Sequence, residues 1–294
     1  MNTVITTAQA QDLRRKRQFR KRLENTGVYV LLTIIGIISI YPFLWTLRTS
    51  LTTSGGIFEF PPSLIPTEPS LKNFITVAEI VPILRQALNS IIICFFGVVG
   101  SIIVAALGAY PLAKMKFFGR DFIFYALIAT LVLPNEAGLI VNFITVKNLG
   151  LLNTDVGQFA AVILPAFGSV ANVFLMRQAY LGIPAELLEA ARIDGASELR
   201  IWWGIMLPLT MPTIAAVSIL QFVAFWNSFL WAFIIMRDRN LYPLSAGMLD
   251  LSGAFSTNTR AISAGAVLMM IPILIVFMFF QRYFMRGLEG AVKG

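Results

Sequence analysis

The sequence predicts an all-α membrane protein with six transmembrane helices. Hydrophobic residues make up 57% of the 294 residues, charged residues make up only 13%, and the mean hydropathy is +0.77. Ordinary soluble chains are far less apolar. Several apolar runs are long enough to cross a hydrocarbon core of about 30 Å. Helices are preferred over a barrel because each run is solidly apolar, whereas barrel strands would alternate over about 10 residues.

The six predicted spans follow one another along the chain. They cover residues 27–47, 88–113, 122–146, 156–176, 207–236 and 261–281. The first is too long for a signal-peptide core and lacks a small-x-small cleavage site, so we expect it to remain as an anchor. Small residues in the second and sixth predict close helix packing. The third is interrupted at Pro134, Asn135 and Glu136, the fourth is a predominantly apolar run, and the fifth begins at Leu207-Pro208.

Lys and Arg are distributed unequally between the two sides of the predicted bundle. Sixteen of the 23 fall on the N-terminal tail, the 114–121 turn, the 177–206 loop and the C-terminal tail. The positive-inside rule therefore predicts that both termini are cytoplasmic. The net charge of +8 on this side indicates contact with anionic lipid and no nucleic acid. The expected domains are a basic tail at 1–26, a six-helix domain at 27–286 and a cytoplasmic tail at 287–294.

Residue usage excludes several kinds of chemistry. Cys94 is the only cysteine and there is no histidine, so disulfide scaffolds, His-based triads and His-ligated zinc or haem are excluded or strained. No phosphate loop of the type G-x-x-x-x-G-K-[ST] occurs, so any ATP must be hydrolysed by another polypeptide. We expect no catalytic residue, no metal and no cofactor on this chain.

Glu136 is the one ionisable candidate within the predicted spans. It follows helix breakers, so it is either a helix end at the interface or a carboxylate that lines a cavity. Coupled carriers usually place several ionisable groups inside the bilayer. A single carboxylate gives little support for a proton relay. A secondary transporter or channel would also predict inverted repeats, which are not visible. A membrane-embedded enzyme would need catalytic groups that the sequence hardly supplies.

The segment 183–208 is a charged helical cassette between two apolar runs on the predicted cytoplasmic side. Pro184 suits the first turn of a helix that spans about 186–196. Asp194-Gly195 favours a turn because glycine tolerates positive φ. Ser197 can then cap a second helix. The simplest interpretation is a hairpin that merely joins two spans.

Two stretches, one inside this cassette and one that begins at its end, resemble the EAA motif in permease subunits of bacterial ATP-binding-cassette importers. They are Glu189-Ala190-Ala191 followed by Asp194-Gly195-Ala196, and Leu207-Pro208-Leu209-Thr210-Met211-Pro212. The 225–230 stretch and the chain end 286–294 are similar to the carbohydrate branch of that family. Within it, the chain most resembles the smaller six-helix permeases of maltose-type systems.

The resemblance implies a type I importer permease fold in a bacterial inner membrane, and a coupling surface on the cassette. That surface would comprise Glu189, Ala190, Ala191, Asp194, Gly195, Ala196 and Ser197. It would seat in a nucleotide-binding ATPase dimer that holds ATP and Mg²⁺, and closure of the dimer would switch the permease between inward-open and outward-open. The tail residues Gly290, Ala291, Val292 and Lys293 would also contact the ATPase, unless this end is frayed.

The implied partners include a second permease subunit, expected as a heterodimer although a homodimer stays open, and an extracytoplasmic solute-binding protein. The external loop at 237–260 is a candidate for contact with that protein. Similar permeases carry sugars, oligosaccharides, polyols and glycerol phosphates. The sequence does not choose among these cargoes.

A translocation path needs amides and aromatic rings near mid-membrane. The candidates are Gln221, Trp226 and Asn227 in the fifth span, Asn135, Glu136 and Asn142 in the third, and Asn89 and Ser90 in the second. Helix packing is the alternative role for each of them. Gln221 and Asn227 together are the strongest candidates, since two amides six residues apart in one span would be costly to leave unpaired in hydrocarbon.

Overall fold

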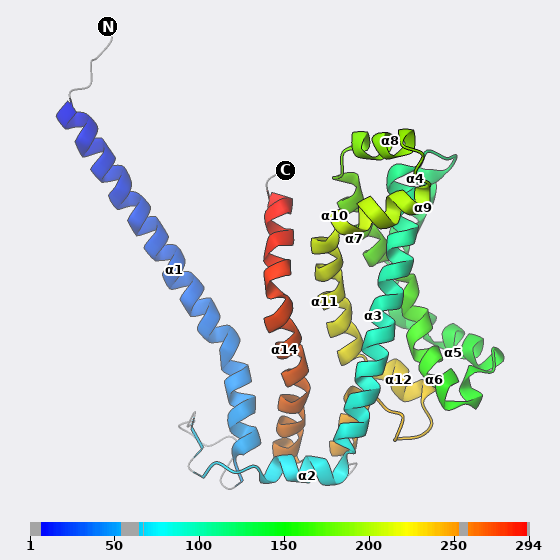
Figure 1. Cartoon of the computed structure of the whole chain (residues 1–294). Helices are drawn as coiled ribbons and strands as arrows, with labels where there is room; N and C mark the ends of the chain where they lie inside the picture. The colour runs from blue at the N-terminus through cyan, green and yellow to red at the C-terminus, as the bar shows by residue number, and fades with distance from the viewer. Residues whose placement is uncertain (1–6, 54–64, 67, 253–257, 293–294) are drawn as a thin grey trace.

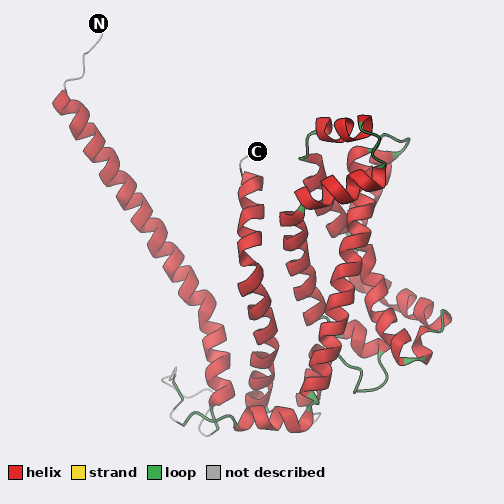
Figure 2. Ribbon diagram, in the orientation of Figure 1, coloured by secondary structure: helices red, strands yellow, loops and turns green. Residues whose placement is uncertain are grey.

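The computed structural model describes residues 7–53, 65–66, 68–252 and 258–292, with side chains described for 25–53, 65–66, 68–134, 137–252 and 258–281. All regular secondary structure in these ranges is helical (Figure 2), in agreement with the predicted all-α class. In chain order the elements are α1 (Thr7–Leu51), α2 (Lys72–Ile80), α3 (Ile83–Lys114), α4 (Arg120–Thr130), η1 (Asn135–Gly138), α5 (Leu139–Asn148), η2 (Leu151–Asn153), α6 (Asp155–Ile163), η3 (Leu164–Gly168), α7 (Val170–Leu181), α8 (Ala185–Ile193), α9 (Glu198–Ile201), a π-helical turn (Trp202–Met206), α10 (Leu207–Leu209), α11 (Met211–Asn227), α12 (Leu230–Ile235), α13 (Leu244–Gly247), η5 (Met248–Leu251) and α14 (Thr259–Val292).

Three predicted spans are single helices. α1 from Asn25, α3, and α14 as far as Gln281 are each long and apolar enough to cross a membrane. Two further crossings are broken helices: α6 and η3 meet α7 at a bend of 45°, and the α9–α10 segment meets α11 at a bend of 76°. Length and composition thus support three to five spans among the described residues. The count of six stays a prediction.

The predicted span 122–146 is not one helix. α4 ends at Thr130, residues 131–134 are not helical, and η1 and α5 follow. Pro134 has no backbone N–H to donate, which favours a helix break at this point. Figure 1 shows α4 near α8 and α9 at one end of the bundle and α5 close to α6 toward the other end. The chain therefore passes along the bundle here by an interrupted route.

The other breaks follow from proline and from helix capping. Pro165 lies in η3, and the hydroxyl of Ser169 accepts a hydrogen bond from the Asn172 backbone N–H at 3.4 Å, which begins α7. Pro212 cannot donate to the carbonyl of Pro208, and the chain bends at Thr210 between α10 and α11. The predicted spans 156–176 and 207–236 are therefore both interrupted.

Two buried clusters lie along α3, which contributes to both. One cluster surrounds Ile93 and Trp226, and the other surrounds Tyr110 and Leu188 near α8. Close packing on α3 is provided by Gly100, where an added Cβ would lie 2.0 Å from the ring of Phe167. This contact agrees with the predicted close approach of the second span.

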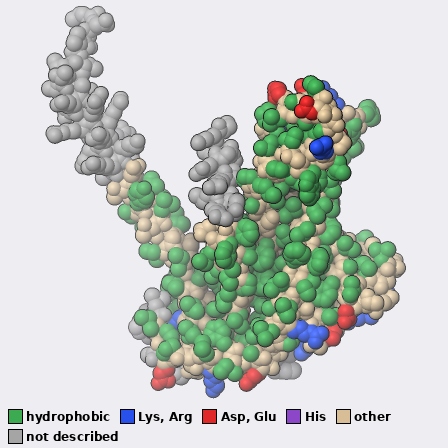
Figure 3. Space-filling view, viewed as in Figure 1, with side chains coloured by type: hydrophobic (Ala, Val, Ile, Leu, Met, Phe, Trp, Pro, Cys, Tyr) green, Lys and Arg blue, Asp and Glu red, His purple; other side chains and the backbone are tan. Residues whose placement is uncertain are grey.

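The surface is arranged as expected for a helix bundle in a membrane. Figure 3 shows apolar side chains over the middle of the visible face and charged side chains toward its two ends. The N-terminal end of α1, the helix α8 and the C-terminal end of α14 lie toward the same end of the molecule (Figure 1). That arrangement fits the predicted topology, and the side of the membrane that this end faces stays a prediction.

Candidate functional site

The cassette folds as a short helix, a left-handed turn and a second helix. α8 ends at Ile193, and Gly195 adopts φ +80°. The backbone N–H of Ala196 donates to the Ala191 carbonyl at 2.9 Å, and that of Gly195 donates to the Arg192 carbonyl at 3.0 Å. These two bonds define a Schellman motif, which ends a helix and requires a residue that tolerates positive φ. The helix therefore ends slightly earlier than the predicted residue 196.

Ser197 caps the second helix, where its hydroxyl accepts a hydrogen bond from the Arg200 backbone N–H at 3.4 Å. The helix continues into the π-helical turn, whose first residue is Trp202. The Trp202 indole N–H lies 3.3 Å from the Ala106 carbonyl of α3 and 3.2 Å from the Tyr180 hydroxyl of α7. The second helix of the cassette is thus held against two helices of the bundle.

The seven predicted coupling residues differ in exposure. Ala191 and Ala196 are half-buried and pack against the cluster that contains Leu188. The other members are exposed: Glu189, Ala190, Asp194, Gly195 and Ser197. The apolar side chain of Ile193 is 86% exposed at the end of α8.

Glu198 joins three elements, although sequence analysis did not single it out. Arg192 Nε donates to Glu198 Oε1 at 2.7 Å, and Tyr110 Oη donates to Glu198 Oε2 at 2.5 Å. Glu198 thereby links α8 and α9 to α3. Tyr110 lies 88 residues away in the sequence, so no local signal pointed to this contact.

Two further contacts hold the end of α3, one to the start of the cassette and one to α7. Lys114 Nζ donates to the Ile183 carbonyl at 2.5 Å, just before α8. Arg177 Nε on α7 donates to the Leu112 carbonyl at 3.1 Å, and its guanidinium lies 3.8 Å from the ring centroid of Phe124. The end of α3 is therefore bonded both to the start of the cassette and to α7.

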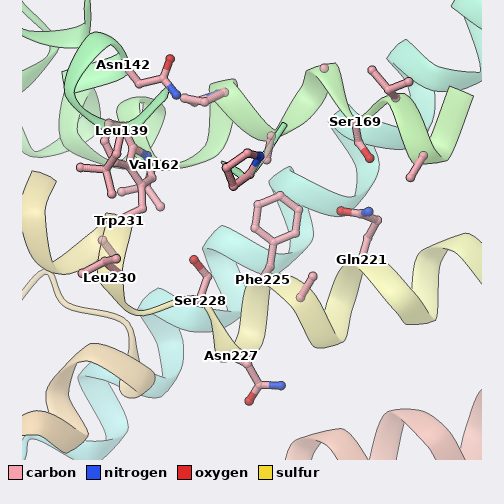
Figure 4. Close-up of a pocket in the computed structure, with 18 of the residues that line it drawn as sticks. Leu139, Asn142, Val162, Ser169, Gln221, Phe225, Asn227, Ser228, Leu230 and Trp231 are labelled. Carbon is pink, nitrogen blue, oxygen red and sulfur yellow. The ribbon is translucent and has the colours of Figure 1, made fainter. Parts of the chain in front are cut away.

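A cavity of about 1130 Å³ lies where three broken helices meet (Figure 4). Its walls come from residues 130–134 at the end of α4 and beyond it, from the α6–α7 break and from the α11–α12 break. The polar lining residues are Thr130, Asn142, Ser169, Gln221, Asn227 and Ser228. On α3, Gly97 leaves room for the ring of Phe225, because an added Cβ would lie 2.4 Å from that ring. Non-helical backbone at membrane depth is tolerated where it lines a cavity, so these walls form a candidate translocation path.

Gln221, Asn227 and Asn142 all line this cavity, but Gln221 and Asn227 do not form a pair. Gln221 Nε2 donates to Asn172 Oδ1 on α7 at 2.9 Å, whereas Asn227 Nδ2 donates to the Val223 carbonyl of its own helix at 3.0 Å. Six residues of α-helix rotate by about 600°, so the two side chains leave α11 about 120° apart. Figure 4 shows Asn227 pointing away from the side on which Gln221 lies. Sequence analysis missed Asn172.

Trp226 does not line the cavity, which corrects the prediction for this residue. Its side chain is 1% exposed, its indole N–H donates to the Met269 carbonyl of α14 at 3.0 Å, and its ring stacks on Phe222. Trp226 therefore fixes α11 against α14. The side chains of Asn135 and Glu136 lie outside the described residues.

Asn89 and Ser90 hold a loop and do not line the cavity. Asn89 Nδ2 donates to the carbonyls of Asn240 at 2.8 Å and Tyr242 at 3.1 Å, and Ser90 Oγ accepts from the Leu244 N–H at 2.8 Å. The start of the predicted external loop 237–260 is thereby packed against α3. Residues 237–240 remain exposed, and residues 253–257 lie outside the described residues.

The predicted C-terminal contact residues lie on the last helix. Gly290, Ala291 and Val292 form the final turn of α14, and Lys293 lies outside the described residues. Among the residues that the structure describes, no cluster of His, Cys, Asp and Glu could hold a metal ion.

Curated proteins similar to this chain are transport permeases. The arabinooligosaccharides transport system permease protein of Halalkalibacterium halodurans is 38% identical over 282 residues, which cover 93% of this chain and 100% of that protein. The sn-glycerol-3-phosphate transport system permease protein of Yersinia pestis bv. Antiqua is 33% identical over 273 residues, covering 90% of this chain and 95% of the relative.

Solved structures agree with these relatives. A chain of a bacterial ABC transporter involved in the import of the acidic polysaccharide alginate matches with a TM-score of 0.74 and 27% identity, over 90% of this chain and 98% of that chain. A second chain, from an alginate ABC transporter in complex with an alginate pentasaccharide-bound periplasmic protein, shares the fold with a TM-score of 0.60 and 14% identity. Residues 68–290 match the binding-protein-dependent transport system inner membrane component. The chain therefore belongs to this family of inner membrane transport components.

Proposed function

We propose that this chain is the permease subunit of an ATP-driven importer and that it moves a sugar or an oligosaccharide across a bacterial inner membrane by alternating access. The observation that carries the proposal is the double role of α3. Tyr110 and Lys114 at one end of α3 bond the cassette, while Ile93 of the same helix lines the cavity. A movement imposed on α8 would thus reach the wall of the path through one continuous helix.

This chain lacks a phosphate loop, so another polypeptide has to hydrolyse the ATP. The proposed energy source is a nucleotide-binding ATPase dimer that binds ATP and Mg²⁺. α8 and the Gly195 turn are the proposed seat for this dimer, with Glu189 and Ile193 exposed toward it. A second permease subunit, proposed as a heterodimer partner, completes the path. An extracytoplasmic binding protein delivers the cargo, in line with the family description. The C-terminal turn of α14 is a proposed second contact with the ATPase.

The cargo class is proposed from the relatives together with the cavity. The curated relatives are named for arabinooligosaccharides and sn-glycerol 3-phosphate, and the structural neighbour imports alginate. Amide and hydroxyl side chains of the lining, such as Gln221 and Ser169, are suited to the hydroxyl groups of such molecules.

Ile193→Asp tests the coupling surface. The residue is 86% exposed, so the change should leave the fold intact, but it places an unpaired charge in the proposed contact with the ATPase. We expect the ATPase subunit to be lost on gentle detergent purification and ATP-driven uptake to fall at least tenfold. Leu149→Asp is the matched control, because Leu149 is 68% exposed and directly follows α5, a helix that Figure 1 shows far from α8.

Two outcomes would contradict the proposal. One is an unchanged association and unchanged uptake in Ile193→Asp. The other is uptake by the wild-type chain that persists without any ATPase subunit, which would indicate a secondary transporter or a channel.

A further inference from the structure

The side chains that the structure describes in the walls of this cavity carry no formal charge. Every lining residue that the structure describes is apolar or bears an amide or a hydroxyl group. The whole stretch 201–236, which includes α11 and α12, contains no Asp, Glu, Lys or Arg. The ionisable residue nearest in sequence to the lining segments is Glu136, which is acidic.

Two hydrogen-bonded amides, Asn172 and Gln221, form a fixed polar group at the wall of this cavity. Asn172 is 2% exposed, and its Oδ1 accepts the hydrogen bond from Gln221 Nε2 at 2.9 Å. Among the described residues its own Nδ2 has no hydrogen-bond partner. The backbone N–H of Asn172 donates to Ser169 Oγ, and Ser169 also lines the cavity. The buried Asn172 thereby fixes the direction of the Gln221 amide at the cavity wall.

The chemistry of these groups discriminates between neutral and charged cargo. An amide offers both donors and an acceptor, as a sugar hydroxyl does, so the two can bond reciprocally. A carboxylate or a phosphate offers only acceptors and loses its hydration on entering such a cavity, which costs several kcal/mol unless a cation compensates for it. Neither Lys nor Arg is among the described lining residues.

We infer that the path through this chain is built for an uncharged, hydroxyl-rich cargo, a neutral oligosaccharide, and that Asn172 positions Gln221 to bind it. The inference rests on the proposed function and narrows its cargo. It separates this chain from relatives whose names specify a phosphate ester or an acidic polysaccharide.

Uptake by whole cells tests the charge class, because cells supply all the partner subunits. Cells without the gene for this chain, and the same cells with the gene restored, are given labelled arabinotriose and maltotriose as neutral probes. Labelled alginate trisaccharide and sn-glycerol 3-phosphate serve as acidic probes. We expect that uptake of at least one neutral probe, and of neither acidic probe, depends on the chain.

Each other result contradicts a specific statement. Chain-dependent uptake of an acidic probe at a rate comparable with a neutral one would overturn the inference and leave the proposed function standing. If uptake of neither neutral probe depended on the chain, the inference would be overturned, whereas the proposed function fails only on the two outcomes given for Ile193→Asp and for uptake without an ATPase subunit.

Leucine substitutions test the positioning role of Asn172. Gln221→Leu and Asn172→Leu are each expected to lower uptake of the neutral probe about three- to tenfold, as the loss of one hydrogen bond of roughly 0.5–1.5 kcal/mol implies. The double variant should be no slower than Gln221→Leu alone, since Asn172 acts through Gln221. Gln178→Leu is the control, because Gln178 is exposed on the same helix as Asn172. Additive losses, or a reduced amount of assembled complex in Asn172→Leu, would overturn the positioning role.

Discussion

Gly195 is the residue at which the cassette depends most directly on backbone geometry. Its φ of +80° lies in the left-handed region, and no atom lies within 4 Å of the position that a Cβ would occupy. Any loss on substitution is therefore backbone strain and not a steric clash. An L-residue other than Asn or Asp costs about 1–2 kcal/mol in this conformation. We expect thermal stability of the purified chain and ATP-driven uptake to fall in the order Gly, Asn, Ala, Val at position 195.

The series has a built-in control, because Asn and Val bracket the tolerance for positive φ at similar side-chain size. Equal stability and equal uptake for Gly195→Asn and Gly195→Val would show that the left-handed turn is not what the position requires.

Single residues of the cassette were predictable because their signals are local. Pro184, Asp194-Gly195 and Ser197 act on backbone within a few residues, and the structure places a helix start, a Schellman turn and an N-cap at these positions. Glu198 was not predictable, since its partner Tyr110 is brought to it only by the packing of α3.

The amide side chains also show that a sequence does not identify partners that are distant along the chain. The sequence identifies Gln221, Asn227 and Asn89 as polar groups that need a hydrogen-bond partner in hydrocarbon, because an unpaired buried amide costs free energy. It could not say which partner each amide meets. Gln221 meets Asn172 and lines the cavity, whereas Asn89 bonds backbone carbonyls of a loop packed against α3.

Among the elements, α3 is the one whose contacts link the cassette to the rest of the bundle. Its Tyr110 is buried and donates to Glu198, whereas Arg192 reaches the same carboxylate from the exposed side of α8. A hydrogen bond to a charged group contributes roughly 1.5–3 kcal/mol, whereas an exposed ion pair contributes about 0.2–1 kcal/mol. We expect Tyr110→Phe to destabilise the purified chain more than Arg192→Gln, as measured by thermal unfolding in detergent.

The two variants should also separate in transport. Tyr110→Phe loosens α9 from α3, so uptake should fall by more than in Arg192→Gln, at equal amounts of bound ATPase. A larger loss of stability or uptake in Arg192→Gln would show that the link to α3 is not the connection that matters.

The sequence predicts correctly that the elements are helices, but it does not predict which spans are broken into shorter helices. Apolar runs long enough to span are visible in the sequence because the hydrocarbon core demands them. The breaks at Ser169 and Ser228 follow from capping and from tertiary contacts, such as the hydrogen bond that Ser245 Oγ donates to the Ser228 carbonyl at 2.8 Å. The breaks near Pro134 and Pro212 had a clearer sequence signal, since proline removes a helical hydrogen bond.

At the scale of the whole molecule, contacts between distant segments indicate which helix ends share a side. The hydrogen bond from Lys114 to the Ile183 carbonyl places the end of α3 beside the end of α7. Between two points on one side, a chain crosses the membrane an even number of times. Figure 1 shows α6 and α7 running from one end of the bundle to the other, which is one crossing. We therefore expect the broken segment 120–148 to supply a second crossing, as the predicted count of six requires.

Cysteine labelling tests this topology directly. Cys94 is buried, so its reaction with a membrane-impermeant maleimide should be slow, and Cys94→Ala removes it entirely. In that background we expect Leu149→Cys, after the proposed third crossing, and Asn240→Cys to be labelled on intact spheroplasts. Ile193→Cys should be labelled only after the membrane is permeabilised, because α8 is expected to face the cytoplasm. If Leu149→Cys instead required permeabilisation as Ile193→Cys does, the segment 120–148 would not cross and the six-helix topology would be wrong.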